Sequence, residues 1–326
     1  MILFLYIKFM DMPKTLIEAI KFFSESENCR SFMIAIRWSD GVVRCPQCGS
    51  DKVVYMEKSR LYNCKVKHPK QKFSLKVGTI FEDSPIGLEK WLPAFWLLSN
   101  CKNGISSYEL ARDLGVTQKS AWFMLHRIRT VMIETGDVKL GHNGPVEIDE
   151  TFVGGKVKNL HKGKRKQSYS YQGGGNKAIV MGMLERGGKV IAKVIQARHK
   201  ADIDPVMTQN IEAGSHIVTD EFNTYGFLST PYQRDVINHA VEYVNGHIHT
   251  NGIENFWTLL KRGLGGTYIS VEPAHLDAYV VEQVYRYNNR KDMNDAGRFS
   301  KLMSQVVGKR LTYTDLTGKE AGATIH

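Results

Sequence analysis

The sequence has few cysteines and lacks the motifs that mark two large protein classes. Its 326 residues include only five cysteines, an odd number, and two of them stand in a Cys-Pro-Gln-Cys pair. This usage argues against a disulfide framework and favours metal binding in a reducing compartment. There is no glycine-rich nucleotide-binding motif and no internal repeat, which excludes the usual phosphate-cradling loops and the solenoid folds.

The sequence also lacks a long hydrophobic run. The apolar stretch from Met1 to Met10 is too short to span a bilayer. No basic segment precedes it and no small-residue cleavage site follows it, so it does not have the form of a signal peptide. We expect an upstream extension, with Met12 as the usual start, and no membrane partner.

What the sequence does contain is a basic, globular composition. With 42% hydrophobic residues over 326 positions, the chain can bury a sizeable core and divide into two or three units. The 44 Lys and Arg against 33 Asp and Glu give a net charge of +11. That excess indicates polyanionic partners and says nothing about the fold.

The stretch from His249 to Arg262 predicts a helix with one acid at the edge of a packed surface. Four apolar residues recur there at helical spacing and form a stripe: Ile253, Phe256, Trp257 and Leu260. Glu254 and Lys261 are seven positions apart, so they stand about 20° from each other around the helix. They form a polar pair beside the core.

Two further carboxylates, Asp149 and Asp220, end short apolar runs that predict strands. Together with the helix acid they would supply the hard oxygen ligands that Mg²⁺ or Mn²⁺ prefers, and a two-ion site needs several carboxylates from different elements. Any one of these acids alone is more simply a solvated surface residue. Strand alternation sends Glu150 and Glu221 to the opposite faces, but Glu147 shares the face of Asp149 and is a rival ligand.

Three phrases of the sequence are typical of one family: Glu147-Ile-Asp-Glu-Thr-Phe-Val-Gly-Gly-Lys156, Val218-Thr-Asp220 and His249-Thr-Asn-Gly-Ile-Glu-Asn-Phe-Trp-Thr-Leu-Leu-Lys-Arg262. From about Cys45 to Arg290 the chain resembles the DDE transposases of bacterial insertion sequences, in the ISXO-like group that places a zinc ribbon ahead of an RNase H-like domain. The resemblance implies an α/β fold, with an RNase H-like mixed-sheet catalytic domain preceded by a zinc ribbon and a helix-turn-helix unit.

The resemblance also implies a chemistry. Asp149, Asp220 and Glu254 would hold Mg²⁺ or Mn²⁺, and Lys261 would hold a phosphate at the cleavage site. The expected activity is binding of terminal inverted repeats, followed by strand cleavage and strand transfer without a covalent protein intermediate. The expected partners are double-stranded DNA of the repeats and of the target, and further copies of the chain in a homo-oligomer on that DNA. The expected location is the cytoplasm, at the nucleoid.

We expect five segments along the chain: an N-terminal helical extension (1–37), a zinc ribbon (38–82), a helix-turn-helix region (83–136), the catalytic domain (145–292) and a C-terminal tail (293–326). The polar, glycine-containing linker from Gly136 to Gly144 is the main boundary.

Three cysteines have the spacing of a zinc ribbon, in which two knuckle turns aim ligands at one structural Zn²⁺: Cys45, Cys48 and Cys64. The second knuckle departs from the family, because Cys64-Lys-Val-Lys-His68 replaces its usual Cys-x2-Cys. His68 is therefore the candidate fourth ligand, and a degenerate ribbon without zinc is the alternative. Cys29 and Cys101 lie in helical patterns and are expected to be core thiols.

Residues 106–132 have the pattern of a helix-turn-helix. Ser106 and Glu109 form a capping-box signature, Gly115 ends the first helix, and Thr117 caps the second. The second helix would present five side chains to a major groove: Gln118, Lys119, Trp122, His126 and Arg129. The alternative is a plain three-helix packing unit with a solvated polar face, in which Trp122 belongs to the core.

Six basic residues follow the first catalytic strand: Lys156, Lys158, Lys162, Lys164, Arg165 and Lys166. With Tyr169, Tyr171 and three glycines they form a loop too polar to pack, and we expect it to contact the DNA backbone. A solvated hairpin tip is the alternative. Arg262 and the segment from Tyr285 to Arg290 add further bases and aromatics for DNA contact.

The remaining pattern of the catalytic domain predicts strands at 178–184, 189–195, 216–219 and 233–238, a helix beginning at Asp204-Pro205, and a helix over 274–288. Three histidines invite a histidine-metal nuclease interpretation, but their spacing fits a zinc site poorly: His239, His247 and His249. We instead assign His249, with Asn251, to the flank of the carboxylate site.

Two other functions are consistent with parts of the sequence. A zinc-ribbon transcription regulator with an inactive core is disfavoured because the three acids and Lys261 are all present. An RNase H-like structure-specific nuclease would share the chemistry, but it would not need two sequence-reading modules.

Overall fold

A computed structural model describes residues 12–134, 136, 139–155, 177–220, 231–237, 249–291 and 293–318. Its contacts divide the chain into two compact units, which we describe separately: residues 1–133 with 292–326, and residues 134–291. The division at residue 134 falls just before the linker that begins at Gly136.

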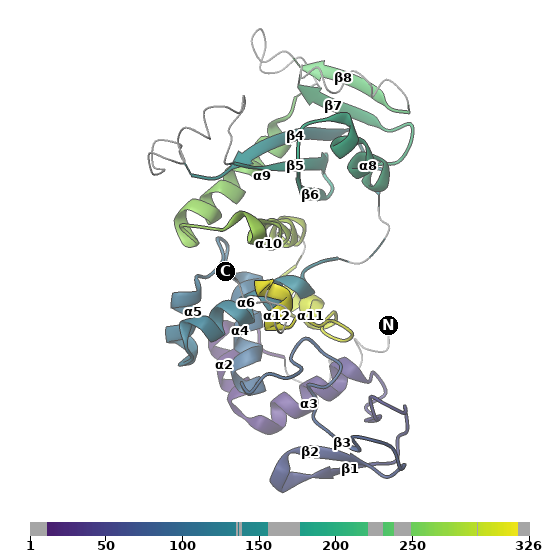
Figure 1. The fold of residues 1–326 in the computed structure, drawn as a ribbon, viewed down its shortest axis with the longest axis vertical. Helices are drawn as coiled ribbons and strands as arrows, with labels where there is room; N and C mark the ends of the chain where they lie inside the picture. The colour runs from purple at the N-terminus through teal and green to yellow at the C-terminus, as the bar shows by residue number, and fades with distance from the viewer. Residues whose placement is uncertain are drawn as a thin grey trace. The chain divides into compact units, whose positions relative to one another are not determined.

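The first unit begins with two helices and a small antiparallel sheet (Figure 1). Its helices are α2 (Leu16–Ser24) and α3 (Ser26–Arg37), and its sheet has the order β1-β2-β3. The sheet elements are β1 (Val53–Met56), η1 (Glu57–Ser59), β2 (Leu61–Cys64) and β3 (Lys72–Phe73). Val53 pairs with Cys64, so the chain returns the third cysteine to the start of β1, only a few residues after Cys45 and Cys48.

Three helices follow in the first unit: α4 (Leu88–Asn100), α5 (Ser107–Leu114) and α6 (Gln118–Val131). A capping box between Ser106 and Glu109 begins α5, and Gly115 ends it with a left-handed φ of 59°. The Thr117 side chain accepts a hydrogen bond from the Ser120 amide and begins α6. These predicted helix ends are confirmed, because each signal acts within one turn of the residue that carries it.

The C-terminal helices α11 (Asp295–Met303) and α12 (Tyr313–Thr317) belong to the first unit. The ring of Phe299 is fully buried and stacks on Phe32, with centroids 5.6 Å apart, and lies 5.2 Å from Trp96. Residues 293–318 therefore complete this core, whereas the sequence set them apart as a tail. The pattern of α11 alone could not reveal partners that lie more than 200 residues upstream.

The second unit is built on a five-stranded mixed sheet in the order β6-β5-β4-β7-β8 (Figure 1). The strands are β4 (Val146–Val153), β5 (Ala178–Glu185), β6 (Val190–Ile195), β7 (His216–Asp220) and β8 (Gln233–Ile237). β4, β5 and β6 pair antiparallel, whereas β7 pairs parallel with β4 and β8 parallel with β7. This is the RNase H-like mixed sheet that the sequence predicts.

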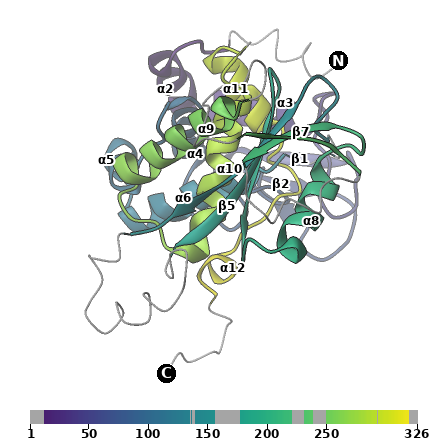
Figure 2. The same cartoon turned by 90° about the horizontal axis from the view of Figure 1, so that it is seen from above.

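Helices cover both faces of this sheet (Figure 2). On one face α8 (Lys200–Asn210) packs Ile203 and Met207 against Val146 and Ile148 of β4. On the other face lie α9 (Asn251–Arg262), η4 (Gly263–Thr267), η5 (Pro273–His275) and α10 (Leu276–Asn288). Because side chains alternate along β4, its odd-numbered residues, which include Glu147 and Asp149, face α9.

One helix start was predicted wrongly. The sequence placed it at Asp204-Pro205, since proline is favoured in a first helical turn, but α8 begins at Lys200 and carries Pro205 inside. The helix tolerates the lost N–H group of Pro205, and its buried residues Ile203 and Met207 fix it on the sheet. Among the described residues, no helix is long and apolar enough to cross a membrane.

Candidate functional site

The sheet sets Asp149 and Asp220 at the same level on neighbouring strands. β4 and β7 run parallel, and the register pairs Val146 with Ile217 and Glu147 with Val218. Continued by two residues along both strands, the same register brings Asp149 of β4 level with Asp220, the last residue of β7. Residues 71 positions apart in the sequence, one in the middle of β4 and one at the end of β7, are therefore level on neighbouring parallel strands.

The helix α9 crosses the same sheet face and carries the third acid. Ile253, Phe256, Trp257 and Leu260 are buried, as the stripe predicts, while Glu254 and Lys261 are exposed. The Thr250 hydroxyl donates to Glu254 Oε1 over 3.1 Å. Glu254 lies in the first turn of α9, where the positive end of the helix dipole favours a negative charge.

Glu147, the alternative candidate ligand on the face of Asp149, makes contacts that hold α9 in place. Its side chain is 1% exposed and pairs with Arg186 Nε at 2.8 Å. Its second oxygen accepts the backbone N–H of Ile253 over 2.9 Å, at the start of α9. A Cβ atom on Gly252 would approach this carboxylate to 2.7 Å, so glycine is needed there for the helix to come so close. Of the two acids on this face, Asp149 is the better candidate ligand.

Asp149 is half-buried and is contacted by α9 itself. Trp257 Nε1 donates to Asp149 Oδ2 over 2.9 Å, and the Glu150 amide donates to Oδ1 over 2.8 Å. Glu150 points to the other face, where it pairs with Arg198 at 3.0 Å, as strand alternation predicts. The sequence treated Trp257 only as core; the signal available was its indole N–H, which needs an acceptor when buried.

The ribbon cysteines gather around a single point. One ligand atom from each of four residues lies within 4.8 Å of all the others: Cys45, Cys48, Cys64 and His68. Cys45 Sγ is 3.4 Å from His68 Nε2, and Cys48 Sγ is 3.6 Å from Cys64 Sγ. In a tetrahedron with Zn–S bonds near 2.3 Å, ligand atoms lie about 3.8 Å apart. Three sulfurs and one imidazole nitrogen thus fit a structural Zn²⁺, with His68 as the fourth donor.

The surroundings of the cluster also suit metal binding. His68 turns Nδ1 away from the thiols, toward Pro69 O at 2.7 Å and Gln47 Oε1 at 3.0 Å, which fixes the ring with Nε2 inward. Burial opposes ionisation of Cys45, but the backbone N–H groups of Cys48 and Gln47 bring the pKa of its thiol down to about 7. Metal ligation requires the thiolate. Cys29, by contrast, is buried, and burial raises the pKa of its thiol to about 12.

The helix α6 presents fewer of the predicted DNA-reading side chains than the sequence suggests. Lys119 is exposed, with its ammonium 4.8 Å from the Tyr313 ring centroid, and Gln118 donates to Ser107 Oγ over 2.8 Å. Arg129 is 1% exposed and His126 2%, so neither lies on a groove-facing surface.

The burial of Arg129 and His126 follows from the helical period. Arg129 is four residues after Leu125 and three before Met132, both buried, so it shares their face. The sequence assigned Arg129 to DNA by its charge and overlooked this face. Trp122 is half-buried, with its ring centroid 4.5 Å from that of His126.

The segment at the end of α10 is also more buried than predicted. Tyr285, Arg286 and Tyr287 are buried, and Arg286 pairs with Glu282 one turn earlier. Asn288 exchanges hydrogen bonds with the backbone N–H and carbonyl of Val190 on the edge strand β6. Consecutive residues point to different sides of a helix, so the end of α10 is enclosed on several sides, and Asn288 ties it to the sheet.

Several predicted residues lie outside the described part of the chain. They are the basic loop with its aromatic and glycine residues (156–176), Glu221, His239 and His247. His249 is described, and its Nδ1 lies 3.4 Å from Glu147 Oε1. Asn251 is exposed at the start of α9, and Arg262 is exposed at its end.

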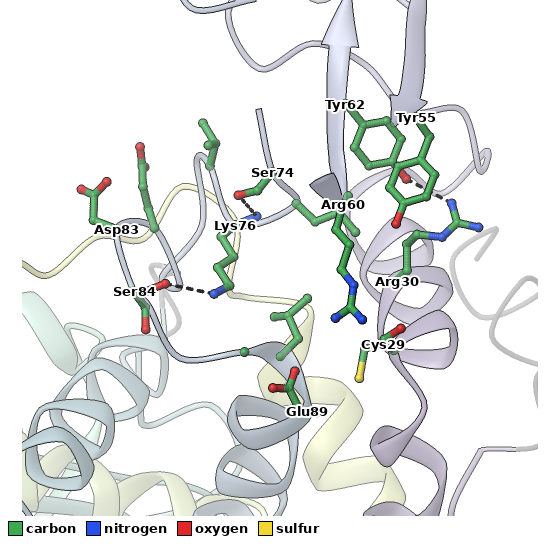
Figure 3. A pocket seen from close by; sticks show the side chains of 16 residues that line it. Cys29, Arg30, Tyr55, Arg60, Tyr62, Ser74, Lys76, Asp83, Ser84 and Glu89 are labelled. Atoms are coloured by element: carbon green, nitrogen blue, oxygen red, sulfur yellow. Dashed lines mark hydrogen bonds between the residues drawn. The ribbon is translucent and has the colours of Figure 1, made fainter. Parts of the chain in front are cut away.

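The first unit contains a cavity of about 440 Å³ between α3, the ribbon and α4 (Figure 3). Arg30, Arg60 and Lys76 line it together with the acids Glu82, Asp83 and Glu89. Lys76 donates to the Ser84 carbonyl over 3.0 Å, and burial lowers the pKa of its ammonium. Equal numbers of acids and bases give this cavity no clear preference for an anion.

Comparisons with known proteins agree with both units. A family model of the ISXO2-like transposase domain matches residues 142–288, and a model of the transposase zinc-ribbon domain matches residues 24–66. An uncharacterized protein in transposable element ISH50 of Halobacterium salinarum is 27% identical over 75% of this chain and 85% of its own length. An uncharacterized transposase-like protein of Haemophilus influenzae is 29% identical over 31% of this chain and 82% of its own length. No solved structure matches the chain.

The first match covers the RNase H-like unit with its level strand acids and the helix α9, and the second covers the Cys45–Cys48 knuckle and Cys64. Together the two matches span more than half of the sequence. The chain therefore belongs to the insertion-sequence transposases that join a transposase zinc ribbon to an ISXO2-like DDE transposase domain.

Proposed function

We propose that this transposase binds the terminal inverted repeats of its element and carries out strand cleavage and strand transfer that depend on Mg²⁺ or Mn²⁺. The observation that supports the proposal best is the β4–β7 register, which sets Asp149 level with Asp220. The hydrogen bond from Trp257 to Asp149 adds to it, since it ties the helix that carries Glu254 to the same strand. Family membership supplies the reaction class.

The donor set fits a hard divalent ion. Asp149, Asp220 and Glu254 offer only carboxylate oxygens, which Mg²⁺ and Mn²⁺ prefer to nitrogen or sulfur. When bound, such ions activate the attacking oxygen and stabilise the leaving one. Glu147 keeps α9 close to the strands, and the Thr250 hydroxyl orients Glu254. These contacts support the assignment of α9 and β4 to one metal site.

Basic residues of the second unit are assigned to phosphate groups. Lys261 is exposed seven positions after Glu254 and therefore lies on nearly the same side of α9. We propose that Lys261 contacts a phosphate at the cleavage site and that Arg262 contacts the adjacent DNA backbone. The basic loop, with Lys156, Lys162, Lys164, Arg165 and Lys166, is assigned to sequence-independent backbone contact.

The first unit is assigned to recognition of the repeats. Zn²⁺ held by the Cys45, Cys48, Cys64 and His68 cluster would fix the ribbon, and α6 would offer Gln118 and Lys119 at its exposed N-terminal end. Arg129 is no longer proposed as a base-reading residue. Transposition joins two element ends to a target, so we propose that copies of the chain assemble as a homo-oligomer on DNA.

The test separates cutting from binding. Glu254→Gln keeps the shape of the side chain and removes a charge, so cleavage and strand transfer should fall to background while binding to repeat DNA stays close to normal. Asp149→Asn and Asp220→Asn should behave alike, and Lys261→Ala should be milder. The matched control is Glu272→Gln, an exposed glutamate of the same unit whose side chain makes no helix cap.

The readouts are Mg²⁺- and Mn²⁺-dependent cleavage of repeat ends, beside a gel-shift measurement of binding. Normal cleavage by the Glu254→Gln protein would remove this acid from the mechanism. Repeat binding without cleavage by the unaltered protein would favour the transcription-regulator alternative.

A further inference from the structure

The side chain of Trp257 connects α9 to the candidate ligand Asp149. It is 5% exposed and lies on the inward face of α9. Its Nε1 donates to Asp149 Oδ2 over 2.9 Å, while Oδ1 of the same carboxylate accepts the Glu150 amide over 2.8 Å. Each carboxylate oxygen can accept about two hydrogen bonds or metal contacts. Each oxygen of the carboxylate thus accepts a hydrogen bond that restricts its rotation.

Gly182 makes this contact possible. It pairs with Asp149 across the β4–β5 ladder. A Cβ atom at residue 182 would stand 2.6 Å from Trp257 Cη2, 2.7 Å from Cζ2 and 2.8 Å from Ile253 Cδ1. These distances are far below van der Waals contact, so any larger residue would push the indole away from Asp149. The space left by one missing side chain opposite Asp149 is filled by the ring that donates to Asp149.

We propose that Trp257 is a positioning residue, which together with Gly182 fixes the Asp149 carboxylate in the orientation that binds the divalent metal. This inference rests on the proposed function. A carboxylate that must be ordered by the metal loses rotational freedom on binding, whereas one held beforehand by a rigid donor does not. Residues that hydrogen-bond to metal ligands commonly change metal affinity or activity by roughly 10–100-fold when altered.

A purely structural role for Trp257 makes a different prediction. A buried indole N–H needs some acceptor, and Asp149 could serve only that need. Losing the N–H group would then alter stability and leave metal affinity unchanged. Metal affinity is therefore the property that distinguishes the two roles.

The first experiment compares Trp257→Phe with Trp91→Phe in the zinc-loaded, full-length protein. Trp91 is a buried tryptophan of the first unit whose Nε1 donates to Ser84 Oγ over 3.0 Å, so its variant loses an equivalent hydrogen bond that does not involve Asp149. Mn²⁺ binding is measured without DNA by electron paramagnetic resonance, and the half-saturating Mg²⁺ concentration is measured in cleavage. Trp257→Phe should lower the Mn²⁺ affinity and raise the half-saturating Mg²⁺ concentration, each by about tenfold or more. Trp91→Phe should change neither quantity.

The second experiment is a double-mutant cycle with Gly182→Ala. Alone, this substitution should weaken Mn²⁺ binding as Trp257→Phe does, because the indole is displaced. Phenylalanine lacks the two ring atoms closest to residue 182, so Gly182→Ala should cost less in the Trp257→Phe background, where the contact with Ile253 Cδ1 remains. Such non-additivity is the signature of a direct contact. Fully additive effects would contradict the proposed coupling.

Asp149→Asn separates failure of this inference from failure of the proposed function. If that variant binds Mn²⁺ and cleaves DNA normally, the carboxylate site itself is wrong. If it loses Mn²⁺ while folded Trp257→Phe and Gly182→Ala bind Mn²⁺ as the unaltered protein does, the site stands and the positioning role of Trp257 is overturned. Thermal unfolding monitors folding throughout.

Discussion

The two units of this transposase differ in how far apart in sequence their functional residues lie. In the first unit the candidate zinc ligands fall within 24 residues, from Cys45 to His68, and the helix ends depend on caps within one turn. In the second unit the proposed metal-binding acids come from β4, β7 and α9, and bringing them together requires the strand register and the contacts of Glu147 and Trp257 with α9. The zinc-ligand cluster is therefore determined mainly by local sequence, whereas the proposed carboxylate site depends on tertiary packing.

The largest effect should follow from removing zinc. Structural zinc contributes on the order of 10 kcal/mol to small modules of this kind, and the ribbon strands are short. We expect about one zinc ion per chain, and we expect chelation or Cys45→Ser to unfold the ribbon while leaving the second unit folded. Metal analysis and circular dichroism with thermal unfolding would show this.

The same experiment tests the fourth ligand and the independence of the units. His68→Ala should lower zinc affinity, and a silent result would place that ligand elsewhere. Unchanged zinc content in Cys45→Ser would refute the ribbon site, and loss of the second unit's transition on chelation would contradict the contrast between local and long-range construction.

A smaller effect, confined to the second unit, should follow from Glu147→Gln. Breaking a buried ion pair leaves an uncompensated charge and costs roughly 3–5 kcal/mol; since Arg186 is partly exposed, we expect the lower end. The variant should also loosen the start of α9, which denaturant unfolding and hydrogen exchange at Ile253 would report.

Glu150→Gln is the matched control for Glu147→Gln. The side chain of Glu150, three positions further along β4, is as buried as that of Glu147 and pairs with Arg198, so its loss should destabilise the unit without freeing the Ile253 amide. Equal protection of Ile253 in both variants would show that Glu147 does not anchor α9.

The particular residues show what the sequence could and could not predict. The Ser106–Glu109 box, Gly115 and the stripe on α9 were predicted because each needs only its own helix. The burial of Arg129 was missed, although helical spacing places it with Leu125. The contacts of Trp257 and Glu147 could not be predicted, because they require the β4–β5 register and the crossing of α9 together.

The smallest expected effect is a pH dependence at Glu185. Burial opposes its ionisation, but hydrogen bonds from the backbone of Asn143 and Gly141 and from the Asn143 side chain prevail and lower the pKa of this carboxyl. Its stabilising contribution is therefore present above the ordinary glutamate pKa and is lost as the pH falls through the lowered value. Glu185→Gln should flatten the acid-side decline in stability of the second unit, and an unchanged profile would contradict this.

The central claim is that acids on β4, β7 and α9 hold one divalent metal site. The most direct test replaces Mg²⁺ with Fe²⁺ and maps where the bound iron, with ascorbate and peroxide, oxidatively cuts the polypeptide. Our account predicts cuts beside Asp149, Asp220 and Glu254 together, all suppressed by Asp149→Asn and competed by Mg²⁺. Cuts confined to one of these elements, or cuts that persist unchanged in Asp149→Asn, would contradict it.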